Sequence, residues 1–247
     1  MVPARENAFV GEIASHYDAD SAGVFHPAVV EPTVDFLASL AGDGRALEFA
    51  IGTGRIGLPL SRRGVPVAGI ELSADMAAEL QKKPGAEAID VTIGDMTSTR
   101  VEGRFRLVYL VFNTIGNLIT QDEQVECFIN AAAHLEPGGC FVIEVLVPRL
   151  RSLPPGETAQ VFAHTATRIG FDEIDVARQL GVSHHIWFRD DGPRRFSTTW
   201  RLVWPAELDL MARLAGMRLR ERWADWDRSP FTGESGKHVS VWEKTTD

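Results

Sequence analysis

The chain has 247 residues, and its 45% content of hydrophobic side chains is enough to bury a full core, so we expect one domain over residues 1–247. Its 34 acidic residues outnumber its 25 basic residues and give a formal net charge of -9, which argues against a nucleic-acid partner. No apolar run approaches the roughly 18 residues of a membrane-spanning helix, so we predict no membrane partner and a soluble, cytoplasmic protein. Cys127 and Cys140 lack the paired spacing of a zinc site or disulfide, and no metal is predicted.

Short apolar runs alternate with helical stretches between residues 45 and 147. This alternation is typical of βαβ units around a parallel sheet with right-handed crossovers. Ser73 is placed to cap the second helix at its N-terminus. The expected strands are residues 45–51, 66–71, 87–93, 105–112 and 139–147, and the expected helices are residues 55–63, 73–83 and 121–135.

The periodicity changes in residues 150–204, which contain two β-rich runs joined by a turn around Asp191-Gly192-Pro193. A helix is expected at residues 205–215, followed by strands at 217–226 and 237–244. The pattern predicts an α/β protein with a doubly wound, mostly parallel sheet, an antiparallel last strand and an antiparallel β insertion acting as a cap. Ligands bind beyond the carboxyl ends of such parallel strands, and the insertion begins at that edge.

A glycine loop, Gly52-Thr53-Gly54-Arg55-Ile56-Gly57, follows the first expected strand. It matches the dinucleotide fingerprint G-x-G-x-x-G, and Glu71 lies at the required spacing of about 20 residues. Glycines let the backbone turn sharply from strand to helix close to a ligand. An NAD(P)-dependent oxidoreductase is therefore one interpretation of this loop.

Three further features resemble the class I S-adenosylmethionine-dependent methyltransferases, which have a Rossmann-like fold. Glu48 leads the series E-x-A-x-G-x-G, Gly94-Asp95-Met96 follows the third strand, and residues 135–145 read LEPGGCFVIEV. Ala50 departs from the family pattern, which has a glycine there. The resemblance spans roughly residues 45–147 and favours a methyltransferase, with a non-catalytic S-adenosylmethionine-binding domain as a second alternative.

The resemblance implies S-adenosylmethionine as cofactor and S-adenosylhomocysteine as product. It implies an acidic residue for the ribose, Glu71, and another near the adenine, Asp95. The cofactor-binding residues that it indicates are Tyr17, Glu48, Ala50, Gly52, Thr53, Gly54, Arg55, Glu71, Leu72, Met76, Gly94, Asp95, Met96, Phe112 and Asn113.

Looser motifs resemble bacterial small-molecule methyltransferases of natural-product pathways, including aminosugar N,N-dimethyltransferases. They are Tyr17-Asp18, GIELSADM, GDM, FNTIGNL and WDRSPF. They imply methyl transfer to N or O of a small molecule and allow a homodimer. Together with the predicted elements, they divide the chain into a lid in residues 1–44, a cofactor core in 45–147, a substrate cap in 150–204, and a last helix and strands in 205–247. Several of the sugar enzymes have a histidine where this chain has Asn117, so their mechanism does not transfer directly.

Catalytic roles are considered for Tyr17, Asn113, Asn117 and His185. Tyr17 either covers the cofactor or packs at a helix entry. The two asparagines either orient the acceptor or bond their own backbone. His184 and His185 point to opposite faces of a strand, so His185 is either a general base or an ordinary sheet histidine.

Substrate contacts are considered for Asn117, Glu144, Arg149, Trp187 and Asp227. Glu144 lies in an apolar strand and needs a partner, so it either faces substrate or is bonded structurally. Trp187 either walls the pocket or packs in the core, and Asp227 either contacts substrate or caps a turn. Arg149 either holds an acidic acceptor or is solvated.

Overall fold

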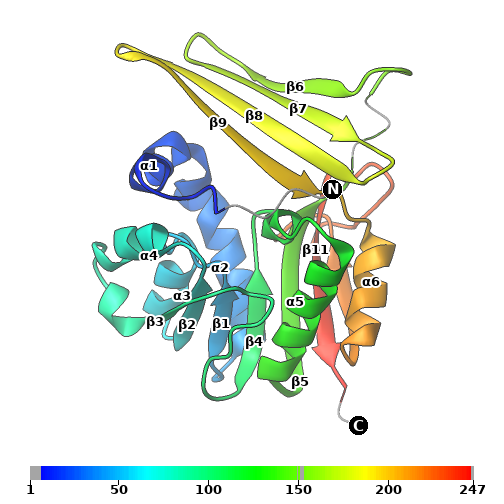
Figure 1. The fold of residues 1–247 in the computed structure, drawn as a ribbon. Helices are drawn as coiled ribbons and strands as arrows, with labels where there is room; N and C mark the ends of the chain where they lie inside the picture. The colour runs from blue at the N-terminus through cyan, green and yellow to red at the C-terminus, as the bar shows by residue number, and fades with distance from the viewer. Residues whose placement is uncertain (1–6, 149, 151–152, 246–247) are drawn as a thin grey trace.

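The structure is a computed structural model that describes residues 7–148, 150 and 153–245. It contains a seven-stranded sheet of order β10-β11-β5-β4-β1-β2-β3 and a four-stranded sheet of order β6-β7-β8-β9. Figure 1 shows the smaller sheet lying above the carboxyl ends of the larger one. The strands of the large sheet are β1 (Ala46–Phe49), β2 (Val67–Glu71), β3 (Asp90–Ile93), β4 (Phe105–Leu110), β5 (Leu135–Leu146), β10 (Met217–Trp223) and β11 (Lys237–Lys244).

The large sheet has the predicted doubly wound topology. β1 to β5 pair in parallel, and β11 is antiparallel to both β5 and β10. β10 therefore runs with the parallel strands, so the loop that follows it opens at the carboxyl edge, as expected. The helices are α1 (Glu12–Asp20), α2 (Pro27–Ala41), α3 (Gly57–Arg62), α4 (Ala74–Gln81), α5 (Gln121–His134) and α6 (Pro205–Leu214), with the 3-10 helices η1 (Ala22–Phe25), η2 (Ala86–Ala88) and η3 (Thr114–Asn117).

Two apolar clusters hold helices against the two faces of this sheet. Phe128 of α5 and Met211 of α6 belong to one cluster, whereas Leu37 of α2 and Leu60 of α3 belong to the other. Ser73 caps α4 as predicted, because its side chain accepts a hydrogen bond from the backbone of Met76. Across the described ranges, the helices lack the length and apolar character that crossing a membrane requires.

The cap differs from the prediction, because it has four antiparallel strands where two β-rich runs were expected. They are β6 (Ala159–His164), β7 (Arg168–Asp175), β8 (Leu180–Arg189) and β9 (Gly192–Arg201). The prediction missed β6 and β7. Gly170 and three acidic residues give β7 a low intrinsic β propensity, so its pairing on both sides decides its structure.

Arg201 anchors the cap to the core at the end of β9. Its buried guanidinium donates to Gln124 Oε1 at 2.7 Å in α5 and pairs with Glu207 Oε1 at 2.5 Å in α6. A buried cation needs such partners, since an unpaired charge away from water is costly. The cap strand nearest the core is therefore fixed at the point where it meets the sheet.

Candidate active site

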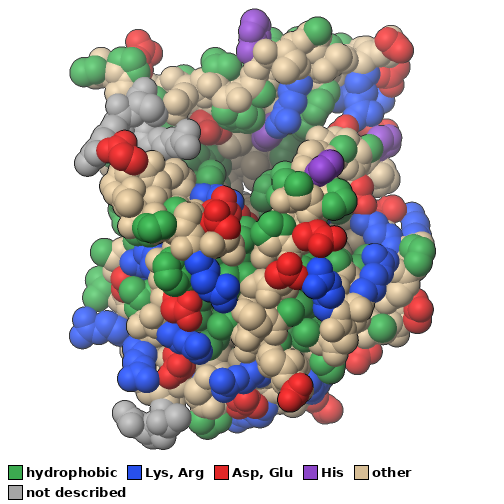
Figure 2. All heavy atoms as spheres, turned by 180° about the vertical axis from the view of Figure 1, so that it is seen from behind, with side chains coloured by type: hydrophobic (Ala, Val, Ile, Leu, Met, Phe, Trp, Pro, Cys, Tyr) green, Lys and Arg blue, Asp and Glu red, His purple; other side chains and the backbone are tan. Residues whose placement is uncertain are grey.

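A cavity of about 410 Å³ lies between the carboxyl edge of the large sheet and the cap. Figure 2 shows the hollow between these two parts from behind. Residues from β1, β2, the segments after β3 and β4, the N-terminal segment and β9 meet around it. They are Asn7, Ala8, Phe9, Tyr17, Glu48, Ala50, Ile51, Gly52, Thr53, Arg55, Ile70, Glu71, Leu72, Met76, Gly94, Met96, Val111, Phe112, Thr114, Asn117, Ile119, Ser197, Thr198 and Thr199.

The glycine loop leaves β1 through three residues with left-handed backbone. Ala50, Gly52 and Gly54 have φ angles of 52°, 57° and 81°. Only glycine adopts this region without steric cost. Ala50 therefore occupies a position whose backbone favours glycine, which is the residue that the family pattern has there.

Glu71 ties the end of β2 to the glycine loop. Its Oε2 accepts from the backbone N–H of Gly52 at 2.8 Å, and its Oε1 accepts from that of Ser73 at 2.8 Å. Burial raises the pKa of Glu71, and these backbone donors partly counter the increase. The carboxylate is thus fixed at the cavity wall.

Glu48 lies buried beneath the same loop and also lines the cavity. The Tyr109 hydroxyl donates to Glu48 Oε2 at 2.9 Å. Burial raises the pKa of Glu48 to about 8, although this hydrogen bond and the charge of Arg55 lower it. A positively charged ligand group beside Glu48 would relieve the cost of burying its carboxylate.

The loop after β3 presents Gly94 and Met96 to the cavity. A Cβ at Gly94 would collide with the Thr99 side chain, so the close packing requires glycine. Asp95 Oδ1 accepts from the backbone and the hydroxyl of Thr97, each at 2.8 Å. These bonds shape the turn that carries Gly94 and Met96.

The N-terminal segment lines the cavity and is bonded to the core. Tyr17 lines the cavity and packs edge-on against Phe9, with ring centroids 5.9 Å apart. Asp18 accepts from Thr53 Oγ1 at 2.6 Å and forms an ion pair with Lys83. This segment is therefore bonded directly to the glycine loop.

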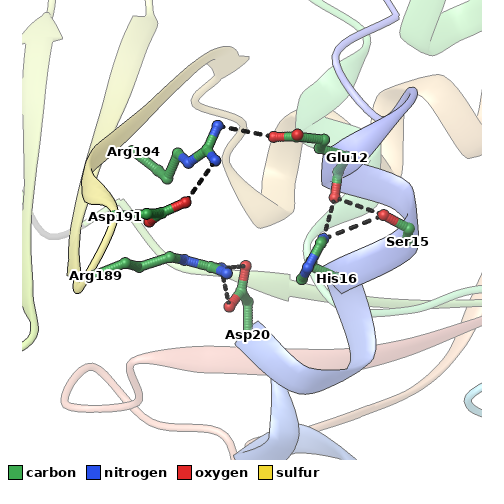
Figure 3. A network of polar contacts seen from close by, with 7 residues as sticks. All are labelled: Glu12, Ser15, His16, Asp20, Arg189, Asp191 and Arg194. Carbon is green, nitrogen blue, oxygen red and sulfur yellow. Dashed lines mark hydrogen bonds and ion pairs between the residues drawn. The ribbon is translucent and has the colours of Figure 1, made fainter.

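The cap also holds α1, through the tip of the β8–β9 hairpin (Figure 3). Arg189 pairs with Asp20 at 2.8 Å, and Arg194 pairs with Glu12 at 3.0 Å. We call these two ion pairs the clasp. They join the tip of the cap hairpin to the N-terminal helix, which also carries the cavity-lining Tyr17.

After β4 the chain makes a left-handed turn at Phe112 and Asn113, with φ angles of 61° and 59°. Glu144 holds this turn, since its Oε2 accepts from the backbone of Phe112 at 3.0 Å. Its Oε1 accepts from Trp226 Nε1 at 3.1 Å and pairs with Lys237 at 3.0 Å. Phe112, 46% exposed, faces the cavity, and the Arg55 guanidinium lies 4.9 Å from its ring centroid.

Asn113 and Asn117 have different surroundings. Asn113 Oδ1 accepts from the backbone of Leu146 at 3.1 Å, which binds the turn to the end of β5. Asn113 is not among the lining residues, whereas Asn117 is. No described residue hydrogen-bonds the Asn117 side chain, so its amide can serve a ligand.

The tautomer of His185 is fixed by Arg168. Arginine can only donate, so the 2.8 Å contact from Arg168 makes His185 Nδ1 an acceptor and leaves the proton on Nε2. Burial, with the charge of Arg168, lowers the pKa of His185 to about 4. Trp187 stacks on His185 with ring centroids 5.4 Å apart. Neither residue lines the cavity.

The remaining sequence candidates among the described residues are not in the lining of the cavity. Glu144 and Asp227 do not line it, and Gly54 and Asp95 lie within loops whose neighbouring residues do. Asp227 is exposed and accepts from the backbone of Ser229 at 2.9 Å, which stabilises a turn. The prediction for Arg149 falls outside the described residues.

Sequence reasoning did not single out Phe9, Thr114, Ile119 or the hydroxyl residues 197–199 of β9 as lining residues. The run FSTTWR contains the only signal for the last three, a group of hydroxyls in an expected strand. The sequence analysis instead assigned the candidate substrate and catalytic roles in this region to Trp187 and His185.

Comparison with known proteins shows what this arrangement belongs to. A model of the methyltransferase domain matches residues 46–139. The solved structure of the CcbJ methyltransferase from Streptomyces caelestis has 34% sequence identity and a TM-score of 0.87, and the match covers 97% of this chain and 99% of that one. The chain is a class I S-adenosylmethionine-dependent methyltransferase.

Two curated relatives extend this result. The methyltransferase is 25% identical over 214 residues to the cypemycin N-terminal methyltransferase of a Streptomyces species, covering 82% of its own chain and 84% of the relative. It is 35% identical over 100 residues, 40% of each chain, to the dTDP-3-amino-3,4,6-trideoxy-alpha-D-glucopyranose N,N-dimethyltransferase of Streptomyces venezuelae. The predicted family, cofactor and natural-product resemblance are confirmed, and an oxidoreductase is not favoured.

Proposed function

We propose that the methyltransferase transfers a methyl group from S-adenosylmethionine to the nitrogen of an amine on a small natural-product intermediate. The printed names of two relatives support an amine acceptor, one at a peptide N-terminus and one on an aminosugar. The observation that carries the choice of nitrogen is the lack of a carboxylate, histidine or lysine among the described residues that line one end of the cavity, where the Arg55 guanidinium over the Phe112 ring can donate hydrogen bonds but not remove a proton.

The cofactor fits the other end of the cavity. The buried carboxylate of Glu48 forms no ion pair with a described residue and suits the cofactor's ammonium group, and Glu71 suits its ribose hydroxyls. Met76 and Met96 provide apolar surface for its adenine ring. We also propose Asp95, at the turn between Gly94 and Met96, for the adenine amino group, and Tyr17 as the cover.

The acceptor end is formed by Val111, Phe112, Thr114, Asn117, Ile119 and residues 197–199. All are neutral. Methylation of a hydroxyl requires a base to remove its proton, whereas an uncharged amine already has a free electron pair. A neutral, largely apolar wall also disfavours the ammonium form of the acceptor by desolvation. The lining therefore suits nitrogen rather than oxygen.

Within this scheme the chain acts by positioning. When bound, S-adenosylmethionine would supply a methyl group on a positively charged sulfur. The amine nitrogen of the substrate would form the new C–N bond as the C–S bond breaks, and the electron pair of the C–S bond would stay on sulfur. The side-chain oxygen of Asn117 accepts a hydrogen bond from an N–H of the substrate amine and so directs the electron pair of that nitrogen toward the methyl group. Phe112 excludes water from the reacting atoms. The methylated product then releases a proton to water.

The proposed division of labour follows the contacts. Residues 1–44 include the lid and residues 45–147 the cofactor core. Residues 150–204 provide the cap that closes the acceptor end through β9, and residues 205–247 complete the sheet.

Methyl transfer to matched amines and alcohols tests the choice of nitrogen. The amine probes are 3-amino-3-deoxyglucose and L-alanyl-glycinamide, and the alcohols are glucose and L-lactoyl-glycinamide. We expect mass spectrometry to find a methyl group on at least one amine and on neither alcohol. Methylation of an alcohol at a comparable rate would refute the choice of nitrogen. Binding of S-adenosylhomocysteine without methylation of any amine would indicate a binding domain.

Asn117→Leu tests the positioning role. Loss of one hydrogen bond formed in the transition state should lower kcat/KM for the methylated amine by about tenfold. The affinity for S-adenosylhomocysteine, measured by calorimetry, should not change. Unaltered kcat/KM would exclude Asn117 from the reaction.

A further inference from the structure

β9 is an edge strand of the cap, and it is the strand that Figure 1 shows nearest the core. It lines the cavity with three consecutive residues, Ser197, Thr198 and Thr199. Successive side chains of a strand point to opposite faces of its sheet. Three consecutive residues therefore line a cavity only if the strand presents its edge, with its backbone, to that cavity.

Three observations fix which backbone groups point out from this edge. Arg189 and Gly192 are the last pair of the β8–β9 hairpin, and two residues separate them. In a hairpin with a two-residue turn, the closing pair is a hydrogen-bonded pair. The backbone N–H of Leu202 donates to Gln179 at 2.8 Å at the other end of the ladder. Pro193, which has no N–H, occupies the next position, whose backbone nitrogen does not donate a hydrogen bond to β8. Even-numbered residues of β9 thus bond β8, and odd-numbered ones face outward.

Ser197 and Thr199 consequently direct both their N–H and C=O groups away from β8, at the cavity. Outside the ladder, no described residue bonds these backbone groups. The carbonyl of Arg201, the next odd-numbered residue, confirms this alternation, because it points away from β8 toward η3. A Cβ built on Gly116 of η3 would lie 3.4 Å from the Arg201 carbonyl oxygen. The edge is therefore covered by η3 at residue 201 and open at residues 197 and 199.

We propose that this open edge binds the acceptor by strand pairing, and that the acceptor is an aminoacyl amide, such as the amino-terminal end of a peptide. An unpaired strand edge offers alternating donors and acceptors that an extended amide chain matches. A sugar ring has no such repeat. The inference rests on the proposed amine methylation and specifies its acceptor.

The geometry of an extended chain also places the reacting nitrogen. When the second residue of the acceptor directs its N–H and C=O toward Thr199, the first residue must direct its groups to the opposite side. Its free amine then faces away from β9, toward the core side of the cavity, where Phe112 and Asn117 lie. Strand pairing thus holds the acceptor without using the amine that receives the methyl group.

Calorimetry on the complex of the full chain with S-adenosylhomocysteine tests the pairing. The probes are L-alanyl-glycinamide and its ester analogue L-alanyl-glycolamide, which lacks only the N–H of the second residue. Loss of one hydrogen bond should weaken binding of the ester by about fivefold to tenfold. Equal affinity of amide and ester would overturn the inference.

Proline substitutions test the same contact from the protein side. Thr199→Pro removes an outward N–H without breaking the ladder, as Pro193 does naturally in the same strand. It should weaken L-alanyl-glycinamide binding by about fivefold to tenfold. Thr199→Val, which keeps the N–H and loses the hydroxyl, is the matched control and should change binding less than about twofold.

Affinity for S-adenosylhomocysteine must be unchanged in both variants, which shows that they are folded. If Thr199→Pro does not fold, the comparison of amide and ester binding to the unaltered chain decides whether the acceptor pairs with β9. Methylation of 3-amino-3-deoxyglucose with no binding of L-alanyl-glycinamide would overturn the strand-pairing inference and leave amine methylation standing.

Discussion

Glu48 shows how a single buried carboxylate links the cofactor site to the stability of the fold. Burial raises its pKa to about 8, against 4.5 for an exposed glutamate. Between these two pH values the folded chain binds a proton that the unfolded chain does not. The free energy of unfolding therefore falls as pH rises from about 4.5 through about 8.

Glu48→Gln should remove this dependence, because glutamine keeps the size of the side chain and has no proton to lose. Between pH 6.5 and 8, where the buried histidines are already neutral, the natural chain should lose about 1.5 kcal/mol more stability than the variant. Urea unfolding at several pH values measures this difference. Parallel curves for the two proteins would show that Glu48 titrates normally.

At the residue scale, more of the proposed cofactor residues than of the proposed acceptor residues line the cavity, and the reason is physical. Glu48, Gly52 and Glu71 belong to one continuous β1–loop–β2 segment, so their spacing alone brings them together. The partners of Glu144 lie in other segments, at Phe112, Trp226 and Lys237. Whether Glu144 faces substrate or the protein could not be read without those long-range contacts.

At the scale of elements, α1 is held on one side by the glycine loop and on the other by the cap hairpin. Asp18 provides the first contact, and the clasp of Arg189–Asp20 and Arg194–Glu12 provides the second. Since α1 carries Tyr17 to the cavity wall, we expect cofactor exchange to require these contacts to open. Exposed ion pairs are individually weak and are screened by salt, which suits a cover that must open at each turnover.

The double variant Arg189→Ala, Arg194→Ala should release S-adenosylhomocysteine several-fold faster, with a change in stability below about 1 kcal/mol. Stopped-flow measurements should also show a dissociation rate that rises with NaCl more steeply in the natural chain than in the variant, which keeps the Asp18–Lys83 ion pair but lacks the clasp. Arg195→Ala is the control, since Arg195 is exposed in the same hairpin and forms no ion pair with a described residue. If all three proteins released the ligand equally fast, the clasp would not limit exchange.

Element prediction succeeded where one strand or helix has a strong pattern of its own. Strands β1, β2 and β4 are mostly apolar and fully or almost fully buried because both faces of the sheet are covered, and their limits agree with the predicted ones to within two residues. β6 and β7 are partly exposed and mix glycine and acidic residues, so their structure depends on pairing with β8. The lining role of β9 depends on its position at the sheet edge, which no local pattern reveals.

At the scale of the whole molecule, the fold places two different surfaces against one cavity. The carboxyl ends of the parallel strands supply glycine-rich turns and two carboxylates, and the cap supplies neutral hydroxyls and a strand edge. The position of the site at the carboxyl edge could be predicted, because it follows from the topology of any open α/β sheet. The choice of acceptor could not, because it depends on how the cap is docked.

Calorimetric titration with S-adenosylhomocysteine tests this account of the site most directly. The unaltered chain should bind one equivalent, and Glu71→Ala should weaken binding by at least about tenfold, because it removes the carboxylate proposed for the ribose. Glu79→Ala, a change in the neighbouring α4 at a residue that does not line the cavity, should bind normally, and NAD should not bind. Unchanged affinity in a folded Glu71→Ala variant, or binding of NAD in place of S-adenosylhomocysteine, would contradict the account.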